Sequence, residues 1–206
     1  QEHSSAASDV YKRQNIIYIF YIMPIQTPIC DFGQKAIPFE LKSTDNKILS
    51  LNDIKGENGT LIMFICNHCP YVKAITKELV EDCSELNKIG INSVAICSND
   101  FVNYPDDSFD NMIKFSNENH FNFPYLHDET QEIAKAYDAV CTPDFFGYNK
   151  NLELQYRGRL RELRKFIPVK DGESDLLIAM RQIAETGKGP EDQIPSAGCG
   201  IKWKYD

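Results

Sequence analysis

Two cysteines three residues apart could support redox or metal chemistry. They are Cys66 and Cys69, within the stretch FICNHCPYVKAI. Such a pair can cycle between dithiol and disulfide, or can give a metal ion two thiolate ligands. A closed zinc site normally has four ligands, and the sequence offers no second C-x-x-C and no matching histidine pair. The pair therefore favours redox chemistry without a metal or cofactor, and a non-catalytic metal or binding module is the alternative.

The flanking segments predict where this pair lies. TLIMFI, residues 60–65, is a continuous β-prone apolar run, typical of a strand buried on both faces. Pro70 suits a first helical turn, where its missing N–H would be unpaired in any case. A helix is predicted over residues 70–88, because apolar residues recur there at helical spacing, at Val72, Ile75, Leu79, Cys83 and Leu86. We expect the pair where a buried strand gives way to a helix.

A helix start can activate a thiol. Its unpaired N–H groups and its dipole favour negative charge, and can lower a thiol pKa from about 8.5 to about 3.5–7.5. We expect Cys66, at the end of the strand, to be the exposed attacking thiol, and Cys69 to be the covered thiol that resolves a mixed disulfide. His68 would stabilise the Cys66 thiolate and make the disulfide more oxidising, unless it is a solvated loop residue.

A distant stretch, VCTPDFF, supplies a second candidate part of the site. Pro143 stands at the mouth of a predicted strand, where proline is normally excluded. A cis Thr142–Pro143 bond would accommodate it and would place Thr142 against the cysteine pair. The Thr142 backbone could then pair with an extended substrate. An ordinary trans proline at a strand start is the alternative.

The rest of the chain predicts an α/β fold with a mixed central β-sheet flanked by helices. A β-hairpin is predicted at residues 37–56 around the turn STDNK, and a second at 143–158. The other predicted elements alternate, with strands at 91–100 and 123–128 and helices at 108–120, 129–139 and 173–189. We assign one domain to residues 23–190 and a packed C-terminal tail to residues 191–206.

The first 22 residues differ from the rest. A polar stretch is followed by the short apolar run NIIYIFYI, with no small-residue cleavage site after it. We interpret residues 1–22 as a non-native or disordered leader, with an export signal as the alternative. Seven cysteines spread through apolar segments indicate a reducing compartment, which favours the cytoplasm. A net charge of −8 argues against nucleic-acid or anionic-membrane partners.

A strand–C-x-x-C–helix unit with a later Thr-Pro resembles the thioredoxin fold. Several blocks resemble the thioredoxin-like, peroxiredoxin-like proteins of the AhpC/TSA superfamily, namely FICNHCPYVKAI, SNDFVNYPDDS, FPYLHDETQEIAKAYDAVCTPDFF, YRGRL and PSAGCGIKWK. The resemblance covers nearly everything from Met23 onward. It implies a thioredoxin-like fold and thiol chemistry on a protein disulfide, a small disulfide or a peroxide, with a thiol reductant such as thioredoxin or glutathione.

The chain departs from the peroxiredoxin signature, Pro-x-x-x-Thr/Ser-x-x-Cys. Aligned on Cys69, it has Ile62 and Cys66 where the proline and threonine would stand. We therefore favour a thiol-disulfide oxidoreductase over an antioxidant peroxidase. TLIMFI contains no acidic residue, so the sequence names no buried carboxylate beside the pair.

The remaining cysteines divide into two groups. Free cysteine packs as a small hydrophobic residue, and we expect Cys30, Cys83 and Cys97 to be structural. Cys141, two residues before Pro143, and Cys199, between two glycines of the tail, are the candidates for an additional redox role.

Overall fold

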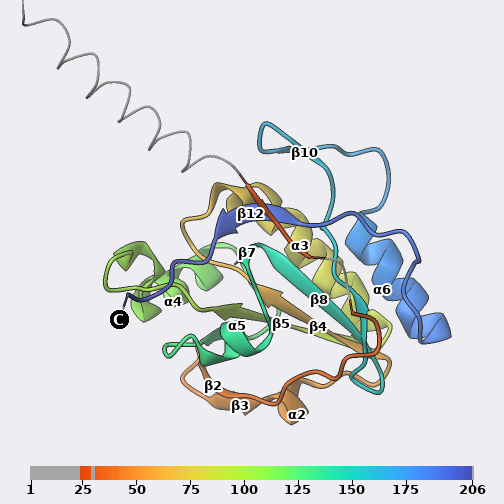
Figure 1. Ribbon diagram of the computed structural model, residues 1–206, viewed down its shortest axis with the longest axis horizontal. Helices are drawn as coiled ribbons and strands as arrows, with labels where there is room; N and C mark the ends of the chain where they lie inside the picture. The colour runs from red at the N-terminus through yellow and green to blue at the C-terminus, as the bar shows by residue number, and fades with distance from the viewer. Residues whose placement is uncertain (1–23, 29–30, 206) are drawn as a thin grey trace, which may run out of the picture.

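A mixed sheet of seven strands, in the order β3-β2-β6-β5-β4-β8-β9, forms the centre of the molecule (Figure 1). The computed structural model describes residues 24–28 and 31–205, so the predicted leader and Cys30 lie outside the described residues. The strands of this sheet are β2 (Glu40–Ser43), β3 (Ile48–Ser50), β4 (Gly59–Phe64), β5 (Ile91–Cys97), β6 (Tyr125–His127), β8 (Asp144–Asn149) and β9 (Leu154–Tyr156).

The strand that leads to the cysteine pair, β4, lies inside this sheet. It pairs in parallel with β5 and antiparallel with β8, and every one of its residues is buried. Leu61 and Met63 belong to the core on one face, whereas Ile62 and Phe64 belong to the core on the other. The run TLIMFI is apolar throughout because both of its faces are covered.

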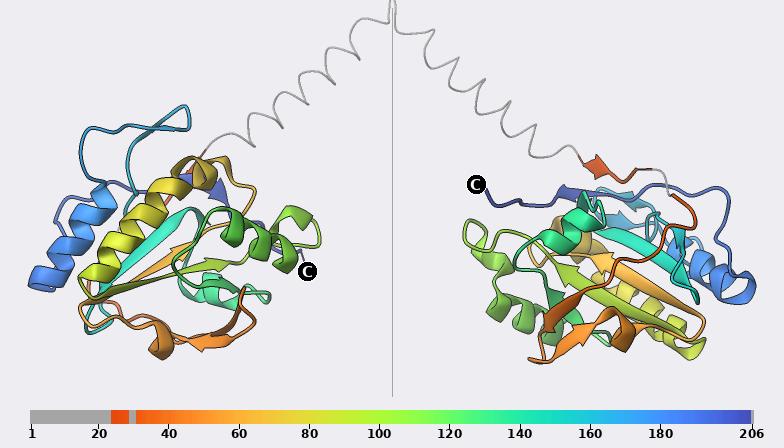
Figure 2. Two further views of the ribbon diagram at one scale, coloured as in Figure 1. Left: turned by 180° about the vertical axis from the view of Figure 1, so that it is seen from behind. Right: turned by 60° about the horizontal axis from the view of Figure 1, so that its bottom comes forward.

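Helices cover both faces of the sheet. One core contains residues of α3 (Pro70–Lys88), α4 (Phe109–Glu118) and α6 (Asp175–Thr186). In Figure 2 (left), α3 and α6 lie side by side across that face. The opposite core contains residues of α2 (Leu51–Ile54) and α5 (Glu132–Ala136). In the part of the chain that the structure describes, no helix is both long enough and apolar enough to cross a membrane.

Short strands outside the central sheet bring the tail to the site. A three-stranded sheet has the order β1 (Ile25–Gln26), β12 (Ala197–Gly200), β7 (Cys141–Thr142), with both pairings antiparallel. The right view of Figure 2 shows β1 lying along β12. A separate hairpin joins β10 (Leu163–Arg164) to β11 (Ile167–Pro168). β1 and β12, from the two ends of the described chain, therefore form one sheet with β7.

The predicted fold class is confirmed. The first hairpin is formed by β2 and β3, the second by β8 and β9, and α3 has the predicted bounds. All five predicted inward positions of α3 are buried. α6 ends at Gly187, whose positive φ of 77° is a conformation that glycine adopts without steric cost.

An ion pair beneath Pro143 anchors the turn that faces the cysteines. Asp144, the first residue of β8, is fully buried, and Arg157 donates to it with Nη2 at 3.0 Å from Oδ2. The same Oδ2 accepts the N–H of Val140, and the guanidinium lies 4.4 Å from the centre of the Phe146 ring. Burial raises the pKa of Asp144, and the Arg157 cation opposes that shift.

Replacing Arg157 should expose the cost of this buried charge. Removal of one partner of a buried pair leaves the other charge uncompensated, so Arg157→Met should lower the free energy of unfolding by about 3–5 kcal/mol near neutral pH. The folded-state pKa of Asp144 would rise further above its unfolded value. The penalty is therefore present at high pH and shrinks as pH falls through the raised pKa. Denaturant unfolding at several pH values measures both effects.

The matched control is Arg181→Met. Arg181 is partly exposed and pairs with the exposed Glu173, so its loss should cost only about 0–1 kcal/mol. Equal destabilisation by the two substitutions, or a deficit in Arg157→Met that grows on acidification, would contradict a role for Arg157 in compensating Asp144.

Candidate redox site at the start of helix α3

The cysteine pair occupies the turn between β4 and α3. Ile65 continues the hydrogen bonding of β4, with its N–H donating to Ile96 O at 3.0 Å. Cys69 is the N-cap residue of α3, Pro70 is the first helical residue, and Lys73 N donates to Cys69 O at 3.0 Å. The turn therefore places the Cys69 sulfur at the helix N-terminus, where unpaired N–H groups favour negative charge.

The prediction that Cys66 is exposed is wrong. Cys66 is 1% exposed and Cys69 is 0% exposed. Sequence spacing places Cys66 outside the helix, but it cannot show what the later parts of the chain place over that turn. The segments that cover it include the loop before α4 and β7.

Thr142 contacts both sulfurs. The Thr142–Pro143 peptide bond is cis, as predicted. The Thr142 hydroxyl oxygen lies 3.3 Å from Cys66 Sγ, and the Thr142 carbonyl oxygen lies 3.1 Å from Cys69 Sγ, which donates to it when protonated. The structure thus brings together Cys66, Cys69 and the Thr142–Pro143 turn, although 73 residues separate Cys69 from Thr142.

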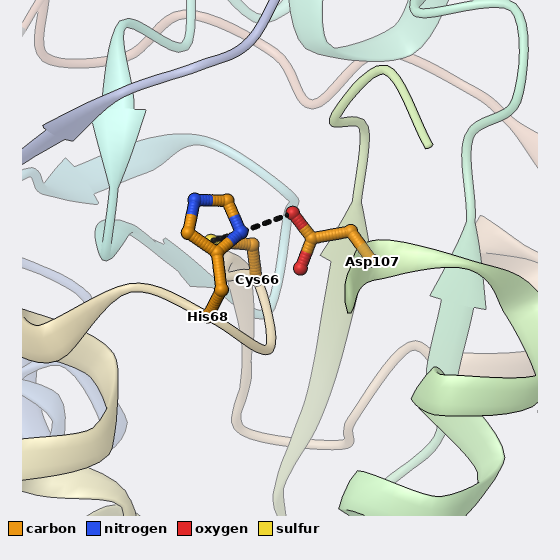
Figure 3. A group of neighbouring side chains, drawn as sticks. All are labelled: Cys66, His68 and Asp107. Carbon is orange, nitrogen blue, oxygen red and sulfur yellow. Dashed lines mark hydrogen bonds and ion pairs between the residues drawn. The ribbon is translucent and has the colours of Figure 1, made fainter. Parts of the chain in front are cut away.

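His68 links Cys66 to a buried acid. His68 Nδ1 lies 2.6 Å from Asp107 Oδ2 and 4.0 Å from Cys66 Sγ. Figure 3 shows the imidazole turned toward the Asp107 carboxylate, with Cys66 beside it. The ring also stacks on Tyr104, with ring centres 5.8 Å apart and planes 9° apart. The His68 side chain is therefore fixed by its contacts with Asp107 and Tyr104, and it is not a solvated loop residue.

Asp107 is the functional residue that sequence reasoning missed. It ends the short 3₁₀ helix η1 (Pro105–Asp107), and its side chain is fully buried. Besides meeting His68, it accepts the Asn67 backbone N–H at 2.8 Å and the Asn99 side-chain amide at 2.7 Å. The only signal in the sequence is its place in the block SNDFVNYPDDS, which does not distinguish Asp107 from its neighbour Asp106.

The surroundings of the two sulfurs shift their pKa values in opposite directions. Interactions with Cys199, Cys66 and Thr142 and with the Val72 N–H lower the pKa of Cys69 against the opposing effect of burial. Burial, the interaction with Cys69 and the Asp107 charge raise the pKa of Cys66. These shifts favour negative charge on Cys69, the N-cap residue of α3, whereas the sequence led us to expect it on Cys66.

The two cysteines that are candidates for an additional redox role, Cys199 and Cys141, have different surroundings. Cys199 is half-buried and packs against the buried cluster that contains Cys66 and Cys69. Cys141 is buried, and its thiol lies 3.5 Å from the Pro143 carbonyl oxygen. Cys83 and Cys97 are buried in the core, as expected of structural residues. The six described cysteines are all free thiols.

Two other features could bind a ligand. The nearest donor atoms of Cys66, His68 and Asp107 lie within 4.8 Å of one another, a set that could hold a metal ion if the His68–Asp107 hydrogen bond opened. A cavity of about 290 Å³ lies beside Pro143, and Tyr71 and Ala197 also line it. None of the described cysteines lines this cavity, although Tyr71 and Ala197 are each two residues from one.

Comparison with known proteins agrees with this fold. Residues 32–162 match the AhpC/TSA family, so the chain belongs to that family. A search among curated proteins found no match. Family membership supports a thiol redox function in the broad sense.

Solved structures extend the similarity beyond the matched segment. An uncharacterized conserved protein from Geobacillus kaustophilus is 43% identical, with a TM-score of 0.84 over 89% of this chain and 97% of that one. A hypothetical protein from Sinorhizobium meliloti 1021 is 31% identical, with a TM-score of 0.81 over 89% and 100%. The thioredoxin domain of a thiol-disulfide oxidoreductase from Bacteroides vulgatus is 16% identical, with a TM-score of 0.54 over 66% and 91%, which shows a shared fold alone.

Neutralising Asp107 should change the titration of Cys66. The Asp107 charge raises the pKa of Cys66, so Asp107→Asn should move the pH midpoint of Cys66 alkylation to a lower value. Iodoacetamide labelling over a pH series, resolved by residue with mass spectrometry, measures that midpoint. Because the pair is buried, labelling rates are compared as pH profiles and not as absolute rates.

Asp106→Asn removes the same charge from the next residue, whose side chain is exposed. It should leave the Cys66 profile unchanged. An equal shift in both variants, or a shift to higher pH in Asp107→Asn, would show that Asp107 does not set the Cys66 titration.

Proposed function

We propose that the protein is a thiol-disulfide oxidoreductase that uses Cys66 and Cys69 as its redox pair. The observation that supports this most directly is the arrangement around Thr142, which contacts both sulfurs. One sulfur is stabilised as a thiolate and the other is protonated, which is the charge state a dithiol needs in order to begin exchange. A second group, His68, lies near the protonated thiol.

The charges assign the order of the two steps. The Cys69 thiolate attacks one sulfur of a substrate disulfide, the substrate S–S bond breaks, and the electron pair leaves with the other substrate sulfur. Cys66 then passes its proton to that first substrate thiolate and attacks Cys69 Sγ, so the Cys66–Cys69 disulfide forms as the second substrate sulfur leaves with its electron pair. The second substrate thiolate takes up one proton from water, so the substrate disulfide is reduced to two thiols and the pair is oxidised. These roles are the reverse of those expected from the sequence, because Cys69 is the cysteine whose pKa is lowered.

His68 and Asp107 border the thiol that acts in the second step. His68 Nδ1 lies 4.0 Å from Cys66 Sγ and donates its proton to Asp107 Oδ2 at 2.6 Å, so this nitrogen is not the acceptor of the Cys66 proton. Asp107 fixes the orientation of the ring, in the way that a carboxylate orients a histidine elsewhere. Asp107 is therefore a positioning residue for His68.

We further propose the partners. The cavity beside Pro143 fits part of a protein or small-molecule disulfide, and a thiol reductant such as thioredoxin or glutathione would reopen the Cys66–Cys69 bond. A reducing compartment such as the cytoplasm fits six free cysteines. The net charge of −8 disfavours nucleic acid and anionic membrane as partners.

Single substitutions separate the roles of the two cysteines. Cys69→Ser should abolish disulfide reduction, since it removes the thiolate that attacks. Cys66→Ser, in a background in which Cys199 is also replaced by serine, should carry out the first step only and accumulate a mixed disulfide on Cys69. Turbidity of reduced insulin measures turnover, and intact-mass analysis with a peptide disulfide detects the trapped adduct.

Cys83→Ala is the matched control, because Cys83 is buried on the same helix but is not part of the site. It should reduce insulin like the original protein. Normal turnover by either Cys66→Ser or Cys69→Ser would refute the redox pair. Trapping by Cys69→Ser instead of Cys66→Ser would keep the pair and restore the order of steps expected from the sequence.

Peroxidase activity is a second candidate, supported by the lowered pKa of Cys69. Cys69 stands at the attacking position of the peroxiredoxin signature, although Ile62 and Cys66 replace the proline and threonine of that signature. Oxygen transfer from peroxide would convert the Cys69 thiolate to a sulfenic acid and release water once the leaving oxygen is protonated.

Without the proline and threonine, we expect Cys69 to react with hydrogen peroxide slowly, at a rate typical of an unassisted thiolate. Stopped-flow mixing of the reduced protein with hydrogen peroxide, with dimedone labelling to locate the sulfenic acid, measures this rate. Rapid sulfenic acid formation at Cys69 that is absent from Cys69→Ser would favour the peroxidase instead.

A further inference from the structure

The C-terminal tail occupies the edge where a substrate strand would pair. An extended peptide can bind a protein by adding a strand to an exposed edge. Here Cys199 of β12 stands opposite Thr142 in antiparallel register, so the edge beside the cysteine pair is filled by the chain itself. Figure 1 shows β12 crossing the molecule next to β7, above the start of α3.

Tight contacts hold β12 in this place. A Cβ atom added at Gly198 would lie 2.1 Å from the Thr142 carbonyl oxygen, so only glycine allows the strand to approach so closely. Before the strand, Ser196 Oγ donates to Pro143 O at 2.8 Å, and after it Lys202 N donates to Asn99 Oδ1 at 2.9 Å. The tail is thus fixed on both sides of Cys199.

The register brings a third sulfur to the pair. Cys199 packs against the buried cluster that contains Cys66 and Cys69, and its interaction with Cys69 raises the pKa of Cys199 while it lowers that of Cys69. Cys66 and Cys69 are almost completely buried, whereas Cys199 is half-buried. Of the three thiols, Cys199 is therefore the one that solvent reaches.

We propose that Cys199 is a third redox thiol that exchanges disulfides with Cys69 and so connects the buried pair to the surface. The proposal rests on the proposed function, since it deepens the chemistry of that site. Its structural basis is the pairing of Cys199 with Thr142, which contacts both sulfurs of the pair, and the packing of Cys199 against the cluster that contains them.

The exchange balances without an added oxidant. Starting from the Cys66–Cys69 disulfide, Cys199 loses its proton and its sulfur attacks Cys69 Sγ. The Cys66–Cys69 bond breaks, the Cys69–Cys199 bond forms, and the electron pair leaves with Cys66, which takes up one proton. The interaction that raises the pKa of Cys199 is with the Cys69 thiolate, so that cause is absent once Cys69 is in a disulfide. An external thiol then reduces the Cys69–Cys199 bond at the accessible Cys199.

Peptide mapping of Cys66→Ser tests this proposal directly. Trypsin cleaves after Lys55, Lys73, Lys188 and Lys202, so residues 56–73 carry Cys69 as their sole remaining cysteine, and residues 189–202 carry Cys199. After equilibration across a glutathione redox series, we expect the peptides 56–73 and 189–202 to be joined in a 1:1 disulfide. Recovery of Cys69 and Cys199 only as free thiols or separate glutathione adducts would overturn the proposal.

Two glycine variants show whether the strand position is responsible. Gly198→Ala should push β12 away from Thr142 and lower the yield of the joined peptides at least severalfold. Gly200→Ala is matched to it on the other side of Cys199, and its nearest neighbour is the movable end of the Ile25 side chain, so the yield should be unchanged. Equal yields in both variants would contradict a role for the β12 pairing.

The insulin assay separates failure of this proposal from failure of the proposed function. If Cys66 and Cys69 act alone, Cys199→Ser reduces insulin at the normal rate and the joined peptides are missing. That result refutes a redox role for Cys199 and leaves the proposed oxidoreductase function intact. If the joined peptides form but the original protein reduces no disulfide, Cys199 exchange stands and the proposed function fails. We expect the joined peptides to form and Cys199→Ser to lose at least half of its turnover.

Discussion

A buried negative charge on sulfur must be matched by hydrogen-bond donors, and this requirement shapes the site. An unpaired charge away from water is very costly, so a thiolate at Cys69 depends on the donors that surround it. These come from Cys66 and Val72 nearby, from Thr142 on β7 and from Cys199 on β12. Four separate parts of the fold therefore converge on one sulfur atom, and the central sheet, the cis turn and the tail all help to place them.

The two sulfurs of the pair differ because they face different neighbours. Cys69 faces the helix N-terminus and the tail, whereas Cys66 faces the Asp107 carboxylate, which opposes ionisation of its thiol. The Asp107 carboxylate accepts hydrogen bonds from Asn67, Asn99 and His68. These bonds satisfy the buried carboxylate, so it needs no direct contact with a sulfur. Cys66, whose pKa is raised, thus stands between Cys69, whose pKa is lowered, and the Asp107 carboxylate.

Local patterns in the sequence were sufficient to predict the fold class, the bounds of α3, the position of the pair and the cis turn at Pro143. Each of these follows from spacing or from steric limits within a short segment. The burial of Cys66, the role of Asp107 and the contact of Cys199 with Cys69 depend on how distant segments pack, which no local pattern encodes. The interactions that lower the pKa of Cys69 depend on the same distant packing, since they involve β7 and β12 as well as the helix.

Because β12 is at once the cover of the pair and the carrier of Cys199, molecules of different size must meet the site by different routes. A small thiol can reach the half-buried Cys199 while the strand stays in place. A polypeptide that needs the Thr142 edge must first displace β12, and thereby breaks the contacts of Gly198 and Ser196 with the turn. If the protein reduces polypeptide disulfides as proposed, detachment of β12 would have to precede each reaction with a polypeptide but not with a small thiol.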